Sequence, residues 1–401
     1  MATKGTEVLG FSVGRLSQLR DRLQTGVNQG EIPGAVALVV RREEIACFEA
    51  VGYRDREAGA RMEHDAIFRI ASLTKPLTSL AAMMLVEEAK LSLSTPVSEY
   101  LPVLKGLQVG HQRSDGGLDL EPCRREVTIL DLFRHTSGFT YGWIGNSAVK
   151  KQYQAAGIDQ FVGSAGDYLK QLAELPLQFQ PGTMWGYGVS TDVLGHVVET
   201  ASGTTLAEFI TSRITEPLGM VDTGFWVDQS KQHRIAEPQI DLATGKRPPL
   251  PDRAKRPPRF GGGGAMVSTA DDYGRFCQFW LSGCTADGMH LVSRKTIELM
   301  TADHLPPDVG LDPDVAVLFG PFAPLPVFGS GFGLGFSVRT SLGRTPWHGS
   351  VGDFGWVGSS GCVFWVDPKE QLFAVLLMQA PTQLAPYFYR MRALVYQALV
   401  D

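Results

Sequence analysis

The sequence is poor in cysteine and shows no metal-binding pattern. Its five cysteines are scattered over 401 residues, with neither the density of a disulfide framework nor the spacing of a metal site. The eight histidines form no H-E-x-x-H motif or comparable cluster. We therefore expect no metal and no other cofactor, and the odd number of cysteines favours reduced thiols.

The sequence also lacks a long apolar run and a basic pattern. No stretch of about 18 apolar residues is present, which predicts no transmembrane helix. The opening residues Met1–Glu7 lack the apolar core of a signal peptide. The formal net charge is −5, and no basic stripe is interleaved with aromatic side chains, which argues against nucleic acid. These absences predict a cytoplasmic protein without membrane or nucleic-acid partners.

The composition is that of a globular protein, with 44% apolar and 20% charged residues. The chain is long enough for two domains, or for one large domain with an insertion. Apolar patterns predict strands near both ends of the chain and helices in the middle. The expected strands are residues 35–40, 45–51, 331–339, 361–366 and 372–379, and the expected terminal helices are residues 15–32 and 385–400.

These elements predict an α+β fold in which both ends of the chain build one antiparallel sheet, flanked by the first and last helices. Residues 1–70 and 225–401 would form this sheet domain, and residues 71–224 would form an inserted, mostly helical domain. A cleft between the two domains is the expected place of an active site.

One stretch combines a nucleophile with a candidate activator. Ser72 and Lys75 are three residues apart, and the apolar residues that follow them fall at helical spacing. A helix that begins here brings the hydroxyl and the amine onto one face. The lysine can act as a base if its surroundings hold the amine neutral, and the helix dipole favours negative charge at the serine. The alternative is a plain helix-capping serine.

The same spacing occurs again at Ser147 and Lys150. An S-x-x-K pattern is expected about once by chance in a chain of this length. The second copy lies in a polar stretch beside Lys151, with no apolar run before it, so we expect a solvated loop or helix start. Ser72 instead precedes an apolar helix, which predicts burial at the base of a cleft.

A third serine, Ser12, lies in Gly10–Gly14, which fits the G-x-S-x-G pattern of a nucleophile elbow. That elbow needs a strand before the serine and a helix after it. Few residues precede the pattern, and they show no strand signal, so Ser12 is a poor candidate.

Further motifs follow Ser72 and Lys75 in order along the chain. Tyr187 lies in a W-G-Y-G-V-S run, and Trp356–Gly358 precede a predicted strand. Supporting runs are His135–Gly138, Glu216–Met220 and Gly333–Phe336. Together these features resemble the serine β-lactamase and penicillin-binding-protein superfamily, in its class C-like branch. Within that branch they are most similar to the family VIII carboxylesterases, and the resemblance covers nearly the whole chain.

The resemblance implies an acyl-enzyme mechanism. Ser72 would attack the substrate carbonyl with help from Lys75 and Tyr187, and water would then hydrolyse the acyl-serine. Backbone N–H groups of Ser72 and of Ser359, just past an edge strand, would hold the oxyanion. Gly358 would keep that strand free of a side chain where the substrate approaches.

At two positions the sequence departs from the lactamase pattern and lacks polar groups that would bind a β-lactam. Trp356–Gly358 stand where β-lactamases and peptidases carry Lys-Thr-Gly, so the cation for a substrate carboxylate is absent. Val189 stands where the tyrosine motif usually carries asparagine. Both changes favour an apolar acyl group and make these residues substrate-binding candidates. A rival third motif is Trp347–Gly349, in which His348 would supply a polar contact.

We therefore predict a serine carboxylesterase that hydrolyses short- to medium-chain esters through an acyl-enzyme on Ser72. The alternatives are a class C-like β-lactamase, a D-Ala-D-Ala-type peptidase, an acyltransferase that passes the acyl group to an alcohol, and a penicillin-recognising sensor without turnover. The expected partner is a small-molecule ester. The sequence leaves open the physiological substrate, the chain-length preference and the oligomeric state.

Overall fold

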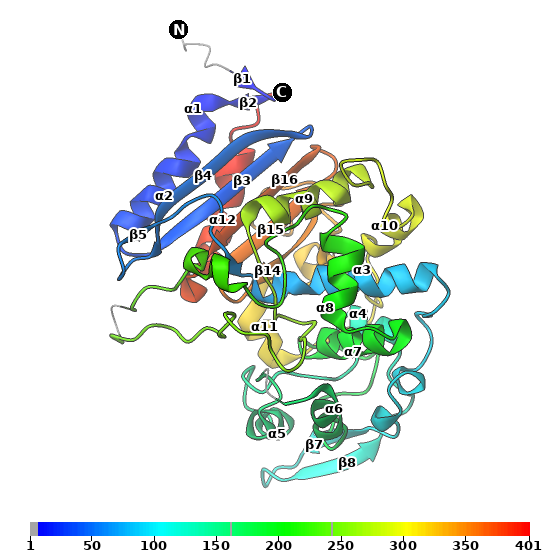
Figure 1. Ribbon diagram of the computed structural model, residues 1–401. Helices are drawn as coiled ribbons and strands as arrows, with labels where there is room; N and C mark the ends of the chain where they lie inside the picture. Colours follow the sequence, from blue (N-terminus) through cyan, green and yellow to red (C-terminus); the bar gives the residue numbers. More distant parts are fainter. Residues whose placement is uncertain (1–6, 161–162, 242–243) are drawn as a thin grey trace.

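An eight-stranded antiparallel sheet forms the centre of the computed structural model, which describes residues 7–160, 163–241 and 244–401 (Figure 1). The strand order is β12-β13-β14-β15-β16-β3-β4-β5, so strands from the two ends of the chain meet in the middle. The strands are β12 Ser330–Phe332, β13 Ser337–Arg339, β14 Phe354–Gly358, β15 Cys362–Asp367, β16 Leu372–Met378, β3 Gly34–Arg41, β4 Glu44–Asp55 and β5 Ala60–Arg61.

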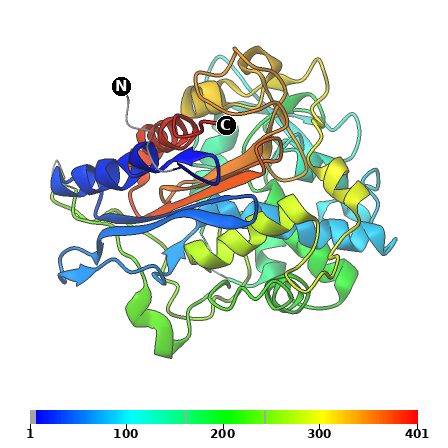
Figure 2. The same cartoon turned by 90° about the horizontal axis from the view of Figure 1, so that it is seen from above.

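Helices cover both faces of this sheet, which explains why every residue of β3 is buried. On one face, Ala35, Ala37 and Val39 pack in a core with the helices α2 (Gln18–Asn28) and α12 (Leu384–Tyr396). On the other face, the alternate residues of β3 pack in the core that includes α9 (Ala270–Ser282). Figure 2 shows α2 and α12 together on one side of the sheet and α9 on the other.

The middle of the chain forms a mostly helical region below the sheet in the view of Figure 1. Its helices are α3 Thr74–Glu87, α4 Ile129–Phe133, α5 Ala148–Ala156, α6 Ala165–Ala173, α7 Ser190–Ser202 and α8 Leu206–Ile210. The remaining helices are α1 Val13–Leu16, α10 Arg294–Met300 and α11 Pro313–Phe319. Paired short strands complete the structure: β1 Glu7–Val8 with β2 Phe11–Ser12, β6 Phe68–Arg69 with β10 Val267–Ser268, β7 Gln108–Gln112 with β8 Leu118–Pro122, and β9 Met184–Trp185 with β11 Gly310–Leu311.

The predicted α+β fold, with its antiparallel sheet flanked by the terminal helices, is confirmed. Two elements differ from the expectation. Residues 331–339 form two short strands, β12 and β13, because the chain reverses at Gly335, whose φ is +108°. The expected first helix, residues 15–32, is divided into α1 and α2 and ends at Asn28. Among the described residues, no helix is long and apolar enough to span a bilayer.

Candidate active site

Ser72 lies where the chain turns into a buried helix. It is the middle residue of a single 3₁₀ turn, Ala71–Leu73, that runs directly into α3. Ala71 has a φ of +46°, in the left-handed region that residues other than glycine rarely adopt. This turn places Ser72, partly exposed, at the positive end of α3.

Lys75 is fully buried beside Ser72. Its Nζ donates to Ser72 Oγ at 3.2 Å, to the Tyr141 hydroxyl at 3.3 Å and to the Gly263 carbonyl at 2.6 Å. The centre of the Tyr187 ring lies 4.6 Å from the same nitrogen, so the ring face covers it. The structure therefore brings Ser72, Lys75 and Tyr187 together, as expected from the sequence.

Tyr141 is a member of this group that the sequence did not single out. Burial raises the pKa of Tyr141 well above its usual value, and the charges of Asp192 and Tyr187 add to the shift, so its hydroxyl stays protonated. The residue follows His135–Gly138, one of the supporting runs, and that position is the only sequence signal that could have pointed to it.

Tyr187 contacts Lys75 through its ring and Trp356 through its hydroxyl. Trp356 Nε1 donates to the Tyr187 hydroxyl at 3.1 Å, and the two ring centres are 5.6 Å apart. The ring of Tyr141 lies 5.6 Å from that of Tyr187 on another side. Two tyrosines therefore flank Lys75, one through its hydroxyl and one through its ring.

Asp192 on α7 holds the backbone that accepts from Lys75. Asp192 Oδ1 accepts from the Gly263 N–H at 3.1 Å, and the Gly263 carbonyl accepts from Lys75 Nζ. A Cβ at Gly263 would lie 2.4 Å from Asp192 Oδ2, and a Cβ at Gly262 would lie 2.5 Å from the Thr191 carbonyl. The glycine run thus lets the chain pass closely between α3 and α7.

The strand β14 carries the third motif along the site. β13 pairs with β14 only as far as Gly355, so Trp356–Gly358 pair with β15 alone among the described strands. Val357 and Ser359 face the cavity, whereas Trp356 is buried behind it. A Cβ at Gly358 would lie 2.4 Å from the Ile70 carbonyl, so this glycine is needed for backbone packing rather than for room around a substrate.

A cavity of about 430 Å³ opens above Ser72, within the usual range for small-molecule sites. Ser72, Tyr141, Tyr187, Val189 and Ser359 all line it. Its apolar lining also includes Ile158, Leu250, Pro251, Leu318, Phe319, Phe322, Leu384 and Ala385, and its charged lining is Arg69, Asp159, Asp192, Arg253 and Arg259. Trp143, half exposed, stands at its edge and stacks on the ring of Tyr141.

Two charged residues of the cavity wall carry shifted pKa values. Burial raises the pKa of Asp159 to about 7; a hydrogen bond from the Gly142 N–H opposes this shift, and the charge of Asp192 adds to it. Burial lowers the pKa of Arg253 to about 10, helped by the neighbouring Arg69. The cavity wall therefore carries both acidic and basic side chains.

His348 does not take part in this group. Its carbonyl accepts from Arg339 and Arg392, and its ring stacks on Tyr396 with centres 6.3 Å apart. The rival third motif Trp347–Gly349 is therefore placed beside α12, and His348 is not among the residues that line the cavity.

The second S-x-x-K copy, Ser147 and Lys150, was expected in a solvated loop or helix start, and only the helix start is found. Ser147 caps α5 by accepting from the Lys150 N–H at 3.2 Å, as a helix start would. Lys150, however, is fully buried, and its Nζ donates to Asp312 at 3.0 Å and to Asp314 at 2.7 Å. The polar sequence around Lys150 did not indicate this buried ion pair, because the two carboxylates come from a distant segment of the chain.

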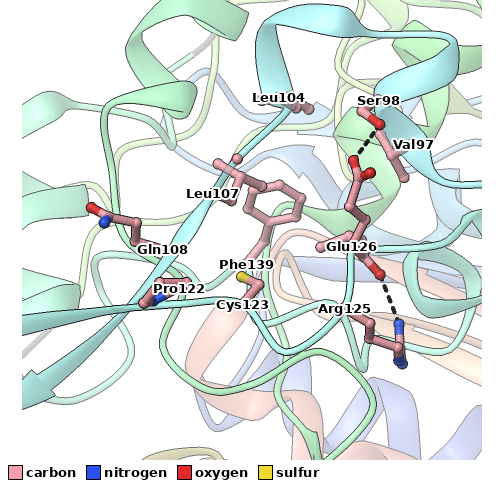
Figure 3. Close-up of a pocket in the computed structure, with 12 residues that line it drawn as sticks. Val97, Ser98, Leu104, Leu107, Gln108, Pro122, Cys123, Arg125, Glu126 and Phe139 are labelled. Carbon is pink, nitrogen blue, oxygen red and sulfur yellow. Dashed lines mark hydrogen bonds between the residues drawn. The ribbon is translucent and has the colours of Figure 1, made fainter.

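A second cavity, of about 320 Å³, lies beside the paired ends of β7 and β8, Gln108 and Pro122, with Phe139 at its centre (Figure 3). Its polar side chains are engaged with their neighbours: Ser98 donates to Glu126, and Arg125 donates to the Glu126 carbonyl at 2.9 Å. Burial raises the pKa of the Cys123 thiol, which makes it a poor nucleophile. The cavity at Ser72 is the stronger candidate. Within the described ranges, no three His, Cys, Asp or Glu side chains group as metal ligands.

Comparisons with known proteins agree with this geometry. The β-lactamase family model matches residues 19–397. The chain is 36% identical over 357 residues to protein Rv1367c of Mycobacterium tuberculosis, covering 87% of this chain and 86% of that protein. It is 36% identical over 268 residues to esterase EstB of Burkholderia gladioli, covering 61% of this chain and 65% of that protein.

Among solved structures, a similar one is EstCE1, a hydrolase with promiscuous acyltransferase activity. The TM-score is 0.77 at 25% identity, and the alignment covers 96% of this chain and 99% of that one. The chain thus belongs to the β-lactamase family.

Proposed function

We propose that this protein hydrolyses short- to medium-chain carboxylic esters through an acyl-enzyme on Ser72. The observation that carries the proposal is the 3.2 Å contact between Ser72 Oγ and Lys75 Nζ at the floor of a largely apolar cavity. A serine needs an adjacent base to act as a nucleophile, and among the described residues the buried Lys75 has only uncharged hydrogen-bond acceptors around its amine.

In the proposed reaction, Ser72 Oγ attacks the ester carbonyl while its proton passes to Lys75. The resulting oxyanion is held by the backbone N–H groups of Ser72 and Ser359, which border the same cavity. The carbonyl re-forms, the C–O bond to the alcohol breaks, and the alkoxide takes the proton from Lys75 by way of Tyr187 or Tyr141. Water then repeats the sequence on the acyl-serine and releases the acid.

Apolar lining and the absence of Lys-Thr-Gly support an ester rather than a β-lactam. Each buried CH₂ of an acyl chain contributes about 0.8 kcal/mol. A penicillin carboxylate would meet an Arg69 whose charge is already paired with Glu237 at 3.0 Å. The relative EstB is an esterase, which supports ester hydrolysis.

A second candidate is acyl transfer from the same acyl-serine to an alcohol. The similar structure of EstCE1, a hydrolase with promiscuous acyltransferase activity, favours this reaction, and the site would need only an alcohol in place of water. Partitioning between the acid and a new ester, measured with p-nitrophenyl butyrate and a primary alcohol, distinguishes the two reactions.

The test is a series of p-nitrophenyl esters beside benzylpenicillin and a chromogenic cephalosporin. We expect kcat/KM for p-nitrophenyl butyrate to exceed that for benzylpenicillin by far, and a fluorophosphonate adduct to be found by mass spectrometry on the peptide of Ser72. Equal or faster turnover of benzylpenicillin, or an adduct on Ser12, would contradict the proposal.

A further inference from the structure

Three charged side chains are buried together behind Trp356, outside the cavity of Ser72. Arg339 on β13 and Arg392 on α12 both donate to Oδ2 of Asp353, at 3.0 and 2.9 Å. Their side chains are 3%, 4% and 6% exposed, respectively. Two guanidinium groups face one carboxylate, so this cluster carries more positive than negative charge in a region that excludes water.

The other partners of the two arginines are uncharged. Arg339 donates to the Trp347 and His348 carbonyls at 3.3 and 3.1 Å, and also to the Thr345 hydroxyl. Arg392 Nη1 donates to the His348 carbonyl at 2.9 Å. Carbonyl and hydroxyl dipoles satisfy N–H donors but cancel no charge, so Asp353 supplies the negative charge in direct contact with the two arginines.

One donor of Arg392 is left over. Its Nε is buried and has no acceptor among the described residues. The ring centres of Trp365 and Phe388 lie 4.9 and 5.2 Å from its guanidinium carbon, and these rings can offer the Nε no oxygen. A nearby carboxylate, Asp367, instead accepts from the Tyr396 hydroxyl at 2.7 Å. Buried donors without partners are rare and point to a ligand or water.

A small cavity of about 40 Å³ lies against this cluster. Arg339, Asp353 and Arg392 line it, together with Trp356, Phe319 and Phe322. A water needs roughly 10–15 Å³ of such space, so the cavity holds only an atom or a group of very few atoms. We propose that it binds a small monovalent anion, which bridges the two arginines and accepts from Arg392 Nε.

Two kinds of ligand could supply such an anion, and both carry one negative charge and accept hydrogen bonds. One is a halide ion of the medium, and the other is a short carboxylate such as formate or acetate. Trp356 separates the cavity from Tyr187, so the anion would lie directly behind the proposed catalytic group. The binding proposal does not rest on the proposed ester hydrolysis.

The test is thermal unfolding in chloride-free buffer, with chloride, bromide, formate or acetate added at constant ionic strength against gluconate. We expect a saturable rise in Tm, of about 1.5 °C at ten times Kd for a chain of this size. Arg392→Gln should lose the rise, and the control Arg390→Gln, on the same helix but partly exposed beside Glu31, should keep it. A response to halides alone identifies an ion site, and a response to carboxylates alone identifies an acid site.

Crystals of the wild-type protein soaked in bromide give an independent answer if Arg392→Gln does not fold. An anomalous peak between Arg339 and Arg392 supports the site. The proposal is wrong if bromide is found only on the surface and no anion raises the wild-type Tm saturably, or if Arg392→Gln responds as the wild type does.

Discussion

Two copies of the same serine–lysine spacing end in lysines that are equally buried but differently surrounded. Around Lys75 the acceptors are two hydroxyls and a carbonyl, all uncharged. Around Lys150 the acceptors are the carboxylates of Asp312 and Asp314, the first of them almost completely buried. Each lysine lies three positions after its serine, so spacing alone does not separate the two sites.

The difference lies in what each surrounding favours. A carboxylate neighbour favours the ammonium form of a lysine, and hydroxyl or carbonyl neighbours do so much less. Lys150 is therefore suited to joining α5 to the segment that begins α11, and Lys75 to exchanging a proton with Ser72. Substitutions in the pair of Ser72 and Lys75 should therefore lower activity, and substitutions in the pair of Ser147 and Lys150 should lower stability.

The largest contrast is expected between the serines. Ser72→Ala should abolish ester hydrolysis, because Ser72 Oγ is the proposed nucleophile and lies 3.2 Å from Lys75 Nζ. Ser147→Ala should leave kcat/KM nearly unchanged and lower the free energy of unfolding by about 1 kcal/mol, the usual effect of losing a helix cap. Initial rates with p-nitrophenyl butyrate and urea unfolding measure the two effects. Activity lost in Ser147→Ala and retained in Ser72→Ala would exchange the roles of the two copies.

Next in size is the loss of the proton path. Lys75→Ala and Tyr187→Phe should each lower kcat by about 100-fold or more, since general-base help typically contributes 10²–10⁴. The double variant should be far from additive, because both groups act on one proton. Should Tyr187→Phe keep full activity while Tyr141→Phe loses it, the path runs through the hydroxyl that already contacts Lys75.

Lys150→Met should act on stability rather than on chemistry. Removing one partner of a buried ion pair leaves its carboxylate without compensation, which costs about 3–5 kcal/mol. The folded protein should keep kcat within about tenfold of the wild type, far from the effect of Lys75→Ala. Lys151→Met is the matched control, because that side chain is exposed and its loss should change stability by about 0.5 kcal/mol at most. An unchanged urea midpoint for Lys150→Met would contradict the structural role.

A pH-dependent effect on stability concerns the carboxyl next to Tyr141. Burial raises the pKa of Asp159 to about 7 in the folded protein, whereas an unfolded aspartate titrates near 3.9. The folded state binds more protons between these values, so this group lowers stability as pH rises from about 4 to 7. Asp159→Asn should therefore gain Tm over the wild type between pH 5 and pH 8. The exposed Asp308→Asn is the control, and an equal pH trend in both variants would refute the assignment.

What the sequence could predict depended on distance along the chain. Ser72 and Lys75 meet because a helix brings residues three apart onto one face, which needs no knowledge of the rest of the fold. Tyr141 and Gly263 come from 66 and 188 residues beyond Lys75, and no helical or strand spacing links them to it.

The third motif shows a second limit of sequence reasoning. Its position was predicted from a resemblance, but strand alternation turns Val357 toward the cavity and Trp356 away from it. Gly358 is explained by the Ile70 carbonyl that it packs against. Such details depend on which neighbours surround a strand, and those neighbours come from other parts of the chain.

The pairing of β3 with β16 at the centre of the sheet also has a consequence for folding during synthesis, because the two strands are far apart in the sequence. Every residue of β3 is buried, and its partner β16 pairs with it from Arg41 with Leu372 to Ala35 with Met378. At a synthesis rate of roughly 5–20 residues per second, about 15–65 s pass between making the two strands. During that interval β3 has β4 as a neighbour but lacks the strand that completes its other edge. The strand β3 at the apolar centre of the finished sheet is thus made well before β16, the strand that completes its other edge.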